Sequence, residues 1–258
     1  MKENLLQFSA WKIEQNEWAP EAESEIQKQL ALSNGYISQY GYAEEHYSAE
    51  NSAEENLRGI TSPLSAGNIL SVRLHEERLD LHNWTVEKFY RCLHRHEPKL
   101  ERSFTAVSPT GNKLEVRSCR QLLTENPHAI DIEYIVRSVN YSGPISFLPL
   151  LGDPAAEEYW YPMLSEVDGE YAAISLQSRS ENVQIAVAMS YRLLKNGQPS
   201  TAKQIRIEKR YVVGYSVTDQ IAPGDEFTLC IRKYVTDSRN FPLHNLFEDA
   251  IASISAHE

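Results

Sequence analysis

Apolar and polar residues alternate along several short segments of the chain. The clearest runs cover residues 130–136, 183–189 and 227–232, and in the second of these Val183, Ile185, Val187 and Met189 alternate with Gln184, Ala186 and Ala188. Successive side chains of a strand leave opposite faces of a sheet, so a period of two predicts half-buried strands. Such strands are typical of antiparallel sheets.

Turn-forming dipeptides separate these runs. Asp168-Gly169 and Asn196-Gly197 supply the positive φ angles that tight hairpins require. Repeated strand–turn–strand units predict an all-β sandwich or barrel. No internal repeat or low-complexity linker interrupts the pattern, which indicates a single β domain.

Helical periodicity is clear near the end of the chain, where apolar residues at three- and four-residue spacing form one stripe: Leu243, Leu246, Phe247, Ala250, Ile251 and Ile254. Pro242 suits the start of that helix. We expect the stripe either to dock on the sandwich or to pair with another copy. No capping glycine follows before Glu258, as expected where a chain is cut at a domain boundary. Residues 21–32 predict a shorter helix.

Composition narrows the range of partners. Of the 258 residues, 36 are acidic and 25 are basic, for a net charge of -11. This charge repels nucleic acid and anionic membranes, and no apolar run approaches the roughly 20 residues that span a bilayer. No secretory signal is visible, so we expect a cytoplasmic protein. Cys92, Cys119 and Cys230 are odd in number and far apart, which predicts reduced thiols.

Six short motifs occur in a fixed order: Trp11–Glu14, Ala31–Tyr36, Arg102–Phe104, Arg117–Arg120, Asn140–Gly143 and Leu151–Gly152. In this order they resemble the amino-terminal domain of glycoside hydrolase family 65, the maltose, kojibiose and trehalose phosphorylases. The resemblance implies an antiparallel β-supersandwich of the galactose mutarotase-like type over residues 1–240. Residues 241–258 would then begin a helical linker to a catalytic barrel that lies outside this sequence.

The resemblance also implies what the domain does. In the family the general acid and the phosphate site belong to the barrel, so we expect no catalytic residue and no cofactor here, and inorganic phosphate would bind the barrel. The expected role is to pack against that barrel, to shape the cleft for an α-linked glucose disaccharide and to support a homodimer. Whether the parent enzyme is a phosphorylase or a hydrolase stays open.

Four residues are candidates for contact with carbohydrate or with an interface: Asn34, Tyr36, Tyr40 and Trp160. Asn34 and Tyr36 lie in a segment like the family's Leu-Gly-Asn-Gly-Tyr-Leu-Gly, in which Ser33 and Ser38 replace glycines. The family continues with Arg-Gly, and Tyr40 replaces that arginine. Asn34-Gly35 itself predicts a structural turn. Trp160 lies between two tyrosines and could stack on a sugar or pack a loop onto a neighbouring element.

Charged residues allow further predictions. The adjacent acids Glu44-Glu45, Glu76-Glu77 and Glu157-Glu158 are predicted to be solvated surface charges. Arg102, Arg117 and Arg120 alternate with apolar neighbours and should pair with carboxylates on a sheet face. His94 and His96 have a spacing that could bind a metal, but no third ligand is identifiable, so no metal site is predicted.

Two alternatives remain. A self-standing carbohydrate-binding module would need an exposed aromatic platform, such as Trp84 or Trp160 on a concave sheet face. An aldose mutarotase-like enzyme would need a histidine and a glutamate that converge in a deep cleft. The histidines available for this are His75, His94, His96 and His128, and none lies in a motif of that family.

Overall fold

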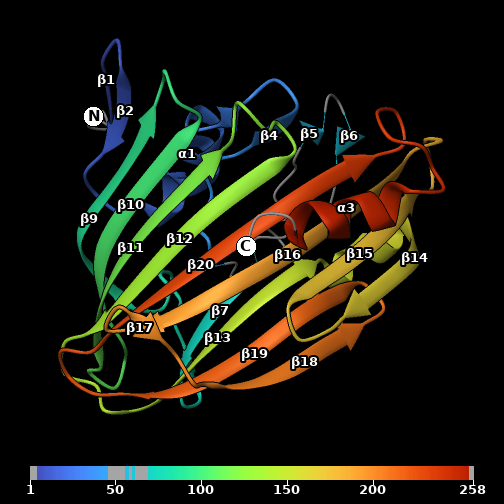
Figure 1. Ribbon diagram of the computed structural model, residues 1–258. Coiled ribbons are helices and arrows are strands. Elements are labelled where there is room, and N and C mark those ends of the chain that lie inside the picture. The colour runs from blue at the N-terminus through green and yellow to red at the C-terminus, as the bar shows by residue number, and fades with distance from the viewer. Residues whose placement is uncertain (1–4, 46–55, 58–59, 62–68, 256–258) are drawn as a thin grey trace.

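The computed structural model describes residues 5–45, 56–57, 60–61 and 69–255 (Figure 1). Its strands form three antiparallel sheets. This confirms the all-β fold, and the second sheet lies behind the first as the second layer of a sandwich (Figure 1). Within the described residues, no helix is long and apolar enough to cross a membrane.

The largest sheet contains eleven strands of the described chain. In spatial order they are β1 (Leu6–Phe8), β2 (Lys12–Gln15), β9 (Thr85–His94), β10 (Lys99–Val107), β11 (Lys113–Leu122), β12 (Ala129–Ser138), β20 (Glu226–Asp237), β16 (Gln184–Lys195), β15 (Tyr171–Ser178) and β14 (Trp160–Val167), with β17 (Gln198–Pro199) paired to β16. The runs of alternating residues seen in the sequence belong to β12, β16 and β20.

Two smaller sheets and four helices complete the described chain. The second sheet has the order β18 (Lys203–Lys209), β19 (Val212–Ile221), β13 (Gly143–Gly152), β7 (Ile69–Leu74) and β8 (Glu77–Arg78). The third has the order β3 (Leu32–Ser33), β4 (Ile37–Gln39), β5 (Asn56–Leu57) and β6 (Ile60–Thr61). The helices are η1 (Pro20–Ala22), α1 (Glu23–Gln29), η3 (Pro154–Glu158) and α3 (Leu246–Ser255).

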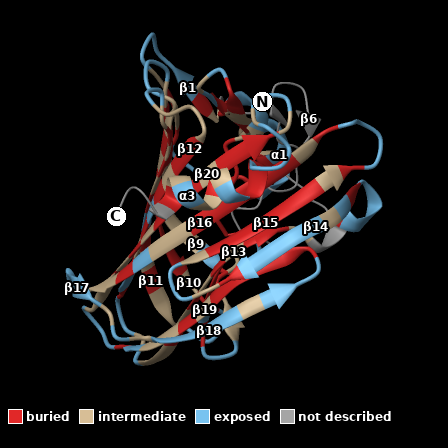
Figure 2. Ribbon diagram, turned by 45° about the vertical axis from the view of Figure 1, so that its right-hand side comes forward, coloured by how far each residue is buried: buried red, intermediate tan, exposed pale blue. Residues whose placement is uncertain are grey.

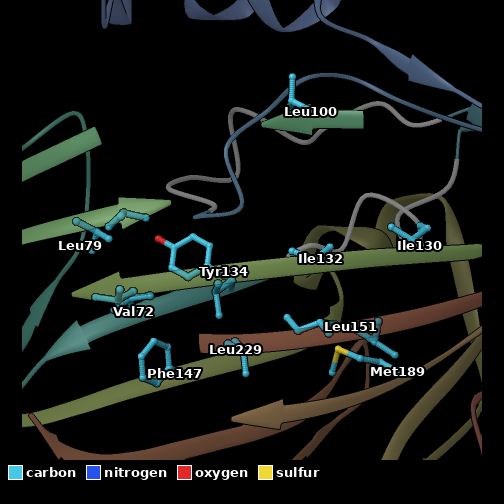
Figure 3. Close-up of a cluster of buried hydrophobic side chains, with 14 of the residues drawn as sticks. Val72, Leu79, Leu100, Ile130, Ile132, Tyr134, Phe147, Leu151, Met189 and Leu229 are labelled. Atoms are coloured by element: carbon cyan, nitrogen blue, oxygen red, sulfur yellow. The ribbon is translucent and has the colours of Figure 1, made fainter. Parts of the chain in front are cut away.

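The main core lies between the two larger sheets. Val72, Phe147 and Leu151 of the second sheet and Met189 and Leu229 of the large sheet are at most 1% exposed, and they lie in the same cluster (Figure 3). Buried residues line the facing sides of both sheets, whereas β14 and β18 at one edge are largely exposed (Figure 2). One set of alternating residues therefore forms the buried face of the sheet, and the other set forms the opposite face, which makes separate contacts.

Two glycines permit close backbone contact within the second sheet. Gly152 has a φ of +90°, and a Cβ there would lie 2.0 Å from the carbonyl oxygen of Tyr211. Gly214 has a φ of +145°, and a Cβ there would lie 2.3 Å from the carbonyl oxygen of Pro149. Any other residue would be strained and would also push β13 away from β19.

Helix α3 packs on the outer face of the large sheet, away from the main core. Leu246, Ala250 and Ile254 are at most 2% exposed and form a separate cluster with alanines at the alternate positions of β15 and β16. Small side chains on the strands let the helix approach closely. Of the two arrangements expected for the apolar stripe, docking on the sandwich is the one observed. The helix begins at Leu246, and Leu243, which was included in the stripe, is 62% exposed.

Truncation of Phe247 tests this docking. Phe247 is 7% exposed, and Phe247→Ala should lower the free energy of unfolding by about 3 kcal/mol through lost burial and a residual cavity. Leu243→Ala is the matched control, since it removes an exposed side chain and should change stability by less than about 0.5 kcal/mol. Urea unfolding measures both, and equal effects would contradict a docked helix.

Candidate functional site

Three arginines project from neighbouring strands onto the inner face of the large sheet. Arg91 on β9 lies directly opposite Arg102 on β10, and Arg120 lies on β11. Their exposures are 0%, 4% and 0%. A buried guanidinium group must be paired, because desolvation of an isolated charge costs several kcal/mol.

The carboxylates come from the segment that crosses this face. Arg102 Nη2 lies 2.8 Å from Glu44 Oε2 and 2.5 Å from Glu45 Oε2, and Arg120 Nη2 lies 3.4 Å from Glu44 Oε1. The hydroxyl of Tyr134 on β12 donates to Glu45. The prediction of a solvated Glu44-Glu45 pair is therefore wrong, since both residues are at most 2% exposed and lie over a row of arginines.

A second ion pair fixes α1. The Nη1 and Nη2 atoms of Arg91 each lie 2.8 Å from one carboxylate oxygen of Glu23, which makes a bidentate pair. Arg91 also donates to Gln15 and to the carbonyl oxygen of Gly41. One guanidinium group thus joins β2, α1 and the segment that leads to Glu44.

The cluster alters the acidity of Glu44. Burial alone would raise the pKa of this carboxyl group, but the positive charges of Arg102 and Arg120 and the hydrogen bond from Ser118 outweigh it and lower the pKa below its ordinary value. Glu44 is therefore a structural anion. A general acid for glycoside cleavage needs a raised pKa instead.

The loop around Asn34 is a turn, as its sequence predicts. Asn34 Oδ1 accepts hydrogen bonds from the backbone N–H groups of Tyr36 and Ile37, and Gly35 has a φ of +90°. The Asn34 amide also donates to the carbonyl oxygens of Leu123 and Pro127, at 2.8 and 3.0 Å. Asn34 thereby ties this loop to the connection between β11 and β12.

Tyr36 connects the same loop to the end of β20. Its hydroxyl donates to Asp237, which is fully buried, and its ring centroid lies 4.0 Å from that of His128. Burial, followed by the hydrogen bond to Asp237, raises the pKa of Tyr36. Burial opposes ionisation of Asp237 too, but the hydrogen bonds from Tyr36 and its other donors lower its pKa overall.

The four candidate residues are divided between two parts of the fold. Asn34, Tyr36 and Tyr40 lie in or beside the third sheet, with Tyr36 4% exposed and Tyr40 half-buried. Trp160 begins β14 at the edge of the large sheet and is also 4% exposed. Its neighbours Tyr159 and Tyr161 are the exposed rings, at 61% and 47%. The structure thus places Tyr36 and Trp160 in the interior.

The histidines have partners other than a metal. His94 Nε2 lies 2.9 Å from Glu101 Oε2, and the ring of His96 lies 4.2 Å from that of Trp11. In the part of the chain that the structure describes, no group of three His, Cys, Asp or Glu residues has metal-binding geometry. His94 and Glu101 contact each other directly, whereas a mutarotase-like site would hold a sugar between such groups.

The arginine prediction is confirmed, and two carboxylates that matter were missed. Besides Arg102 and Arg120, Arg117 pairs with Glu226 at 2.9 Å. Glu23 and Asp237 had not been singled out as anchors. The available signal was position along the strand. Arg102 lies two residues from Leu100 and Phe104 in β10, and Arg120 lies two residues from Leu122 in β11, so both charges fall on the buried face and require buried acids.

Comparison with known proteins defines the family. The sequence profile described as "Glycosyl hydrolase family 65, N-terminal domain" matches residues 13–258. The chain therefore belongs to this family as its amino-terminal domain, and the resemblance inferred from the ordered motifs is confirmed.

Two relatives are phosphorylases. The chain is 22% identical over 218 residues to an alpha,alpha-trehalose phosphorylase of Thermoanaerobacter brockii, covering 75% of this chain and 26% of that protein. A solved structure from the human microbiome, provisionally named kojibiose phosphorylase, superposes with a TM-score of 0.83 at 15% identity over 98% of this chain and 36% of that one. The chain thus spans about a quarter to a third of these proteins.

Removal of a buried guanidinium group tests the ion cluster. Arg102→Met should lower the free energy of unfolding by about 3–5 kcal/mol, because Glu44 and Glu45 lose their main counter-ion in the interior. Arg117→Met is the control, since its pair with Glu226 is exposed and should contribute less than about 1 kcal/mol. Chemical denaturation measures both, and similar losses would show that the buried cluster is not structural.

The lowered pKa of Glu44 predicts a pH dependence of stability. Its contribution is complete above the unfolded pKa of about 4.3 and is lost as the pH falls through the lower folded pKa. Glu44→Gln should therefore be much less stable than wild type at pH 7, and the difference should shrink below about pH 4. The exposed Glu157→Gln should differ little from wild type at either pH. A Glu44→Gln deficit that does not change with pH would refute this role.

Proposed function

We propose that this chain is the non-catalytic amino-terminal domain of a longer α-glucoside phosphorylase or hydrolase of family 65. In this role it packs against a helical catalytic barrel, shapes the cleft for an α-linked glucose disaccharide and contributes to a homodimer. The observation that carries the proposal is the extent of the match, because the domain profile spans residues 13–258 while the chain covers only 26% and 36% of its relatives.

The chemistry of the acids supports a structural role. Glycoside cleavage needs an accessible carboxyl group whose pKa is raised and a second carboxylate across the sugar. Glu44 is buried among arginines and has a lowered pKa. The pKa of Glu101 is lowered as well, chiefly by the hydrogen bond from Lys99, against the effect of burial and with a further contribution from His94.

The proposal also covers the phosphate site, the cellular location and the four candidate residues. Inorganic phosphate would bind the catalytic barrel and not this chain, and the enzyme would work in the cytoplasm. The proposed role of the four candidate residues is to support the cleft or an interface indirectly. Tyr36 and Trp160 are interior side chains and would act by holding loops in place, together with Asn34 and Tyr40.

A self-standing binding module is the second candidate. The exposed ring of Tyr159 favours it, because flat exposed aromatic side chains suit pyranose faces. One face of the Tyr161 ring is covered by the Arg179 guanidinium group, 3.9 Å from the ring centroid. Trp84 and Trp160, the expected platform, are only 6% and 4% exposed. We therefore favour the domain of a larger enzyme over the self-standing binding module.

Activity assays test the proposal. The isolated chain should neither phosphorolyse nor hydrolyse maltose, trehalose or kojibiose, because the general acid and phosphate site belong elsewhere. The longer protein assayed with phosphate is the positive control. Turnover by the isolated chain that is abolished by a substitution within it would refute the domain role.

Sugar binding by the isolated chain should be weak or absent. Affinity for a small ligand depends on burying most of its surface against convergent polar groups, and one wall of a cleft cannot do so. Titration of glucose and maltose, followed by tryptophan fluorescence and amide shifts, measures this. Saturation below about 1 mM, which corresponds to about -4 kcal/mol, would favour the binding module. Tyr159→Ala would then show whether the exposed ring carries the binding.

A further inference from the structure

A groove runs along the outer face of the large sheet, opposite the main core. Two adjacent hollows of about 340 and 620 Å³ share Glu133. The first lies over β10, β11 and β12, and the second over β12, β20 and β16. Ile254 in the last turns of α3 lines the second hollow, so the helix forms one wall.

The floor of the groove is one row of directly opposed residues across five strands: Glu101, Cys119, Glu133, Cys230 and Arg192. Glu133 and Arg192 are exposed, and neither has a hydrogen bond or ion pair among the described residues. Cys119 and Cys230 are short and half-buried, so they leave space beside the two charges. The groove thus presents a carboxylate and a guanidinium group that have no hydrogen-bond or ion-pair partner in the described part of the chain.

The course of α3 links this groove to the region that comes after the domain in longer proteins. The matching profile is that of an N-terminal domain, so in a longer protein the next residues continue from the end of α3. The last turns of α3 lie over β16 and β20 on the outer face (Figure 1), and Ile254 lines the second hollow. The next stretch of polypeptide therefore starts beside the groove.

We propose that the groove between α3 and β10 is the docking surface for the polypeptide region that follows α3 in the longer protein, with Glu133 and Arg192 pairing with opposite charges of that region. This inference rests on the proposed function, and it adds the surface through which the domain contacts the rest of the longer protein. Mixed, separated charges and half-buried side chains resemble the composition of inter-domain interfaces within one chain.

Two other occupants fit the groove less well. A sugar would favour an exposed aromatic ring, but the tyrosines of the lining are engaged, with Tyr90 donating to Glu14 and Tyr191 to Gln204. A second copy can dimerise through another face of the domain, and in this groove it would compete with the polypeptide that continues from the end of α3, where Ile254 lines the second hollow. Both occupants would give distinct outcomes in a thiol-labelling experiment.

The two thiols of the floor report on coverage. The longer protein and this chain are treated with a small maleimide at pH 8, and labelling of each cysteine is followed by peptide mass spectrometry. Cys119 and Cys230 should react at least about tenfold more slowly in the longer protein, because docking covers them. Cys92 is fully buried in the described structure and should stay unlabelled in both, which controls for unfolding.

A charge substitution tests the pairing. Glu133→Lys should abolish the difference in Cys230 labelling between the longer protein and this chain. Labelling in both should become faster, because the negative charge that, after burial, raises the pKa of Cys230 is replaced by a positive one. Glu157→Lys, at an exposed ion pair with Arg210, is the control and should change neither.

Each alternative result overturns the inference. Equal labelling in both proteins shows an uncovered groove, even where the longer protein is an active phosphorylase and the proposed function holds. Protection of this chain that grows with its concentration shows a second copy, and protection only on addition of disaccharide shows a sugar site. A reading frame with no further region overturns both proposals.

Discussion

The buried guanidinium groups of Arg91, Arg102 and Arg120 are the constraint on which the arrangement of the domain depends. Each projects from a strand of the large sheet toward the interior, where an unpaired charge would cost several kcal/mol. Their partners Glu23, Glu44 and Glu45 all come from the first 45 residues. The N-terminal segment is therefore an integral part of the sandwich, because the large sheet cannot bury this part of its face without it.

The two faces of the large sheet follow the same alternation but pack against different partners. On the inner face, large aliphatic residues meet the second sheet and the arginines meet the N-terminal segment. On the outer face, Ala173, Ala186 and Ala188 create the shallow region where α3 packs, and the groove beside it carries charges and thiols. The position of α3 thus follows from where small residues coincide on β15 and β16.

Period and turn chemistry were sufficient to predict the strands, the hairpins and the helical stripe, because those signals are local in sequence. The role of Glu44 and Glu45 was not predictable in this way, since Glu is exposed on average and Arg102 lies 57 residues beyond Glu45. The alignment of Cys119, Glu133 and Cys230 also depends on strand register, which no single segment contains. Trp160 shows the same limit, because β14 contacts β18 and β19 of the second sheet, which come later in the chain.

Three of the six motifs that carry the family resemblance join distant parts of the chain. Asn34 binds carbonyl groups 89 and 93 residues away, and Tyr36 binds Asp237, 201 residues away, at the end of the strand that precedes α3. Arg102 and Arg120 hold the segment that follows this loop. These residues carry buried polar contacts, and their carboxylate partners are held as anions. Groups used in this way fix the geometry of the scaffold, and carboxylates held as anions by buried donors are poorly suited to exchange protons with a substrate.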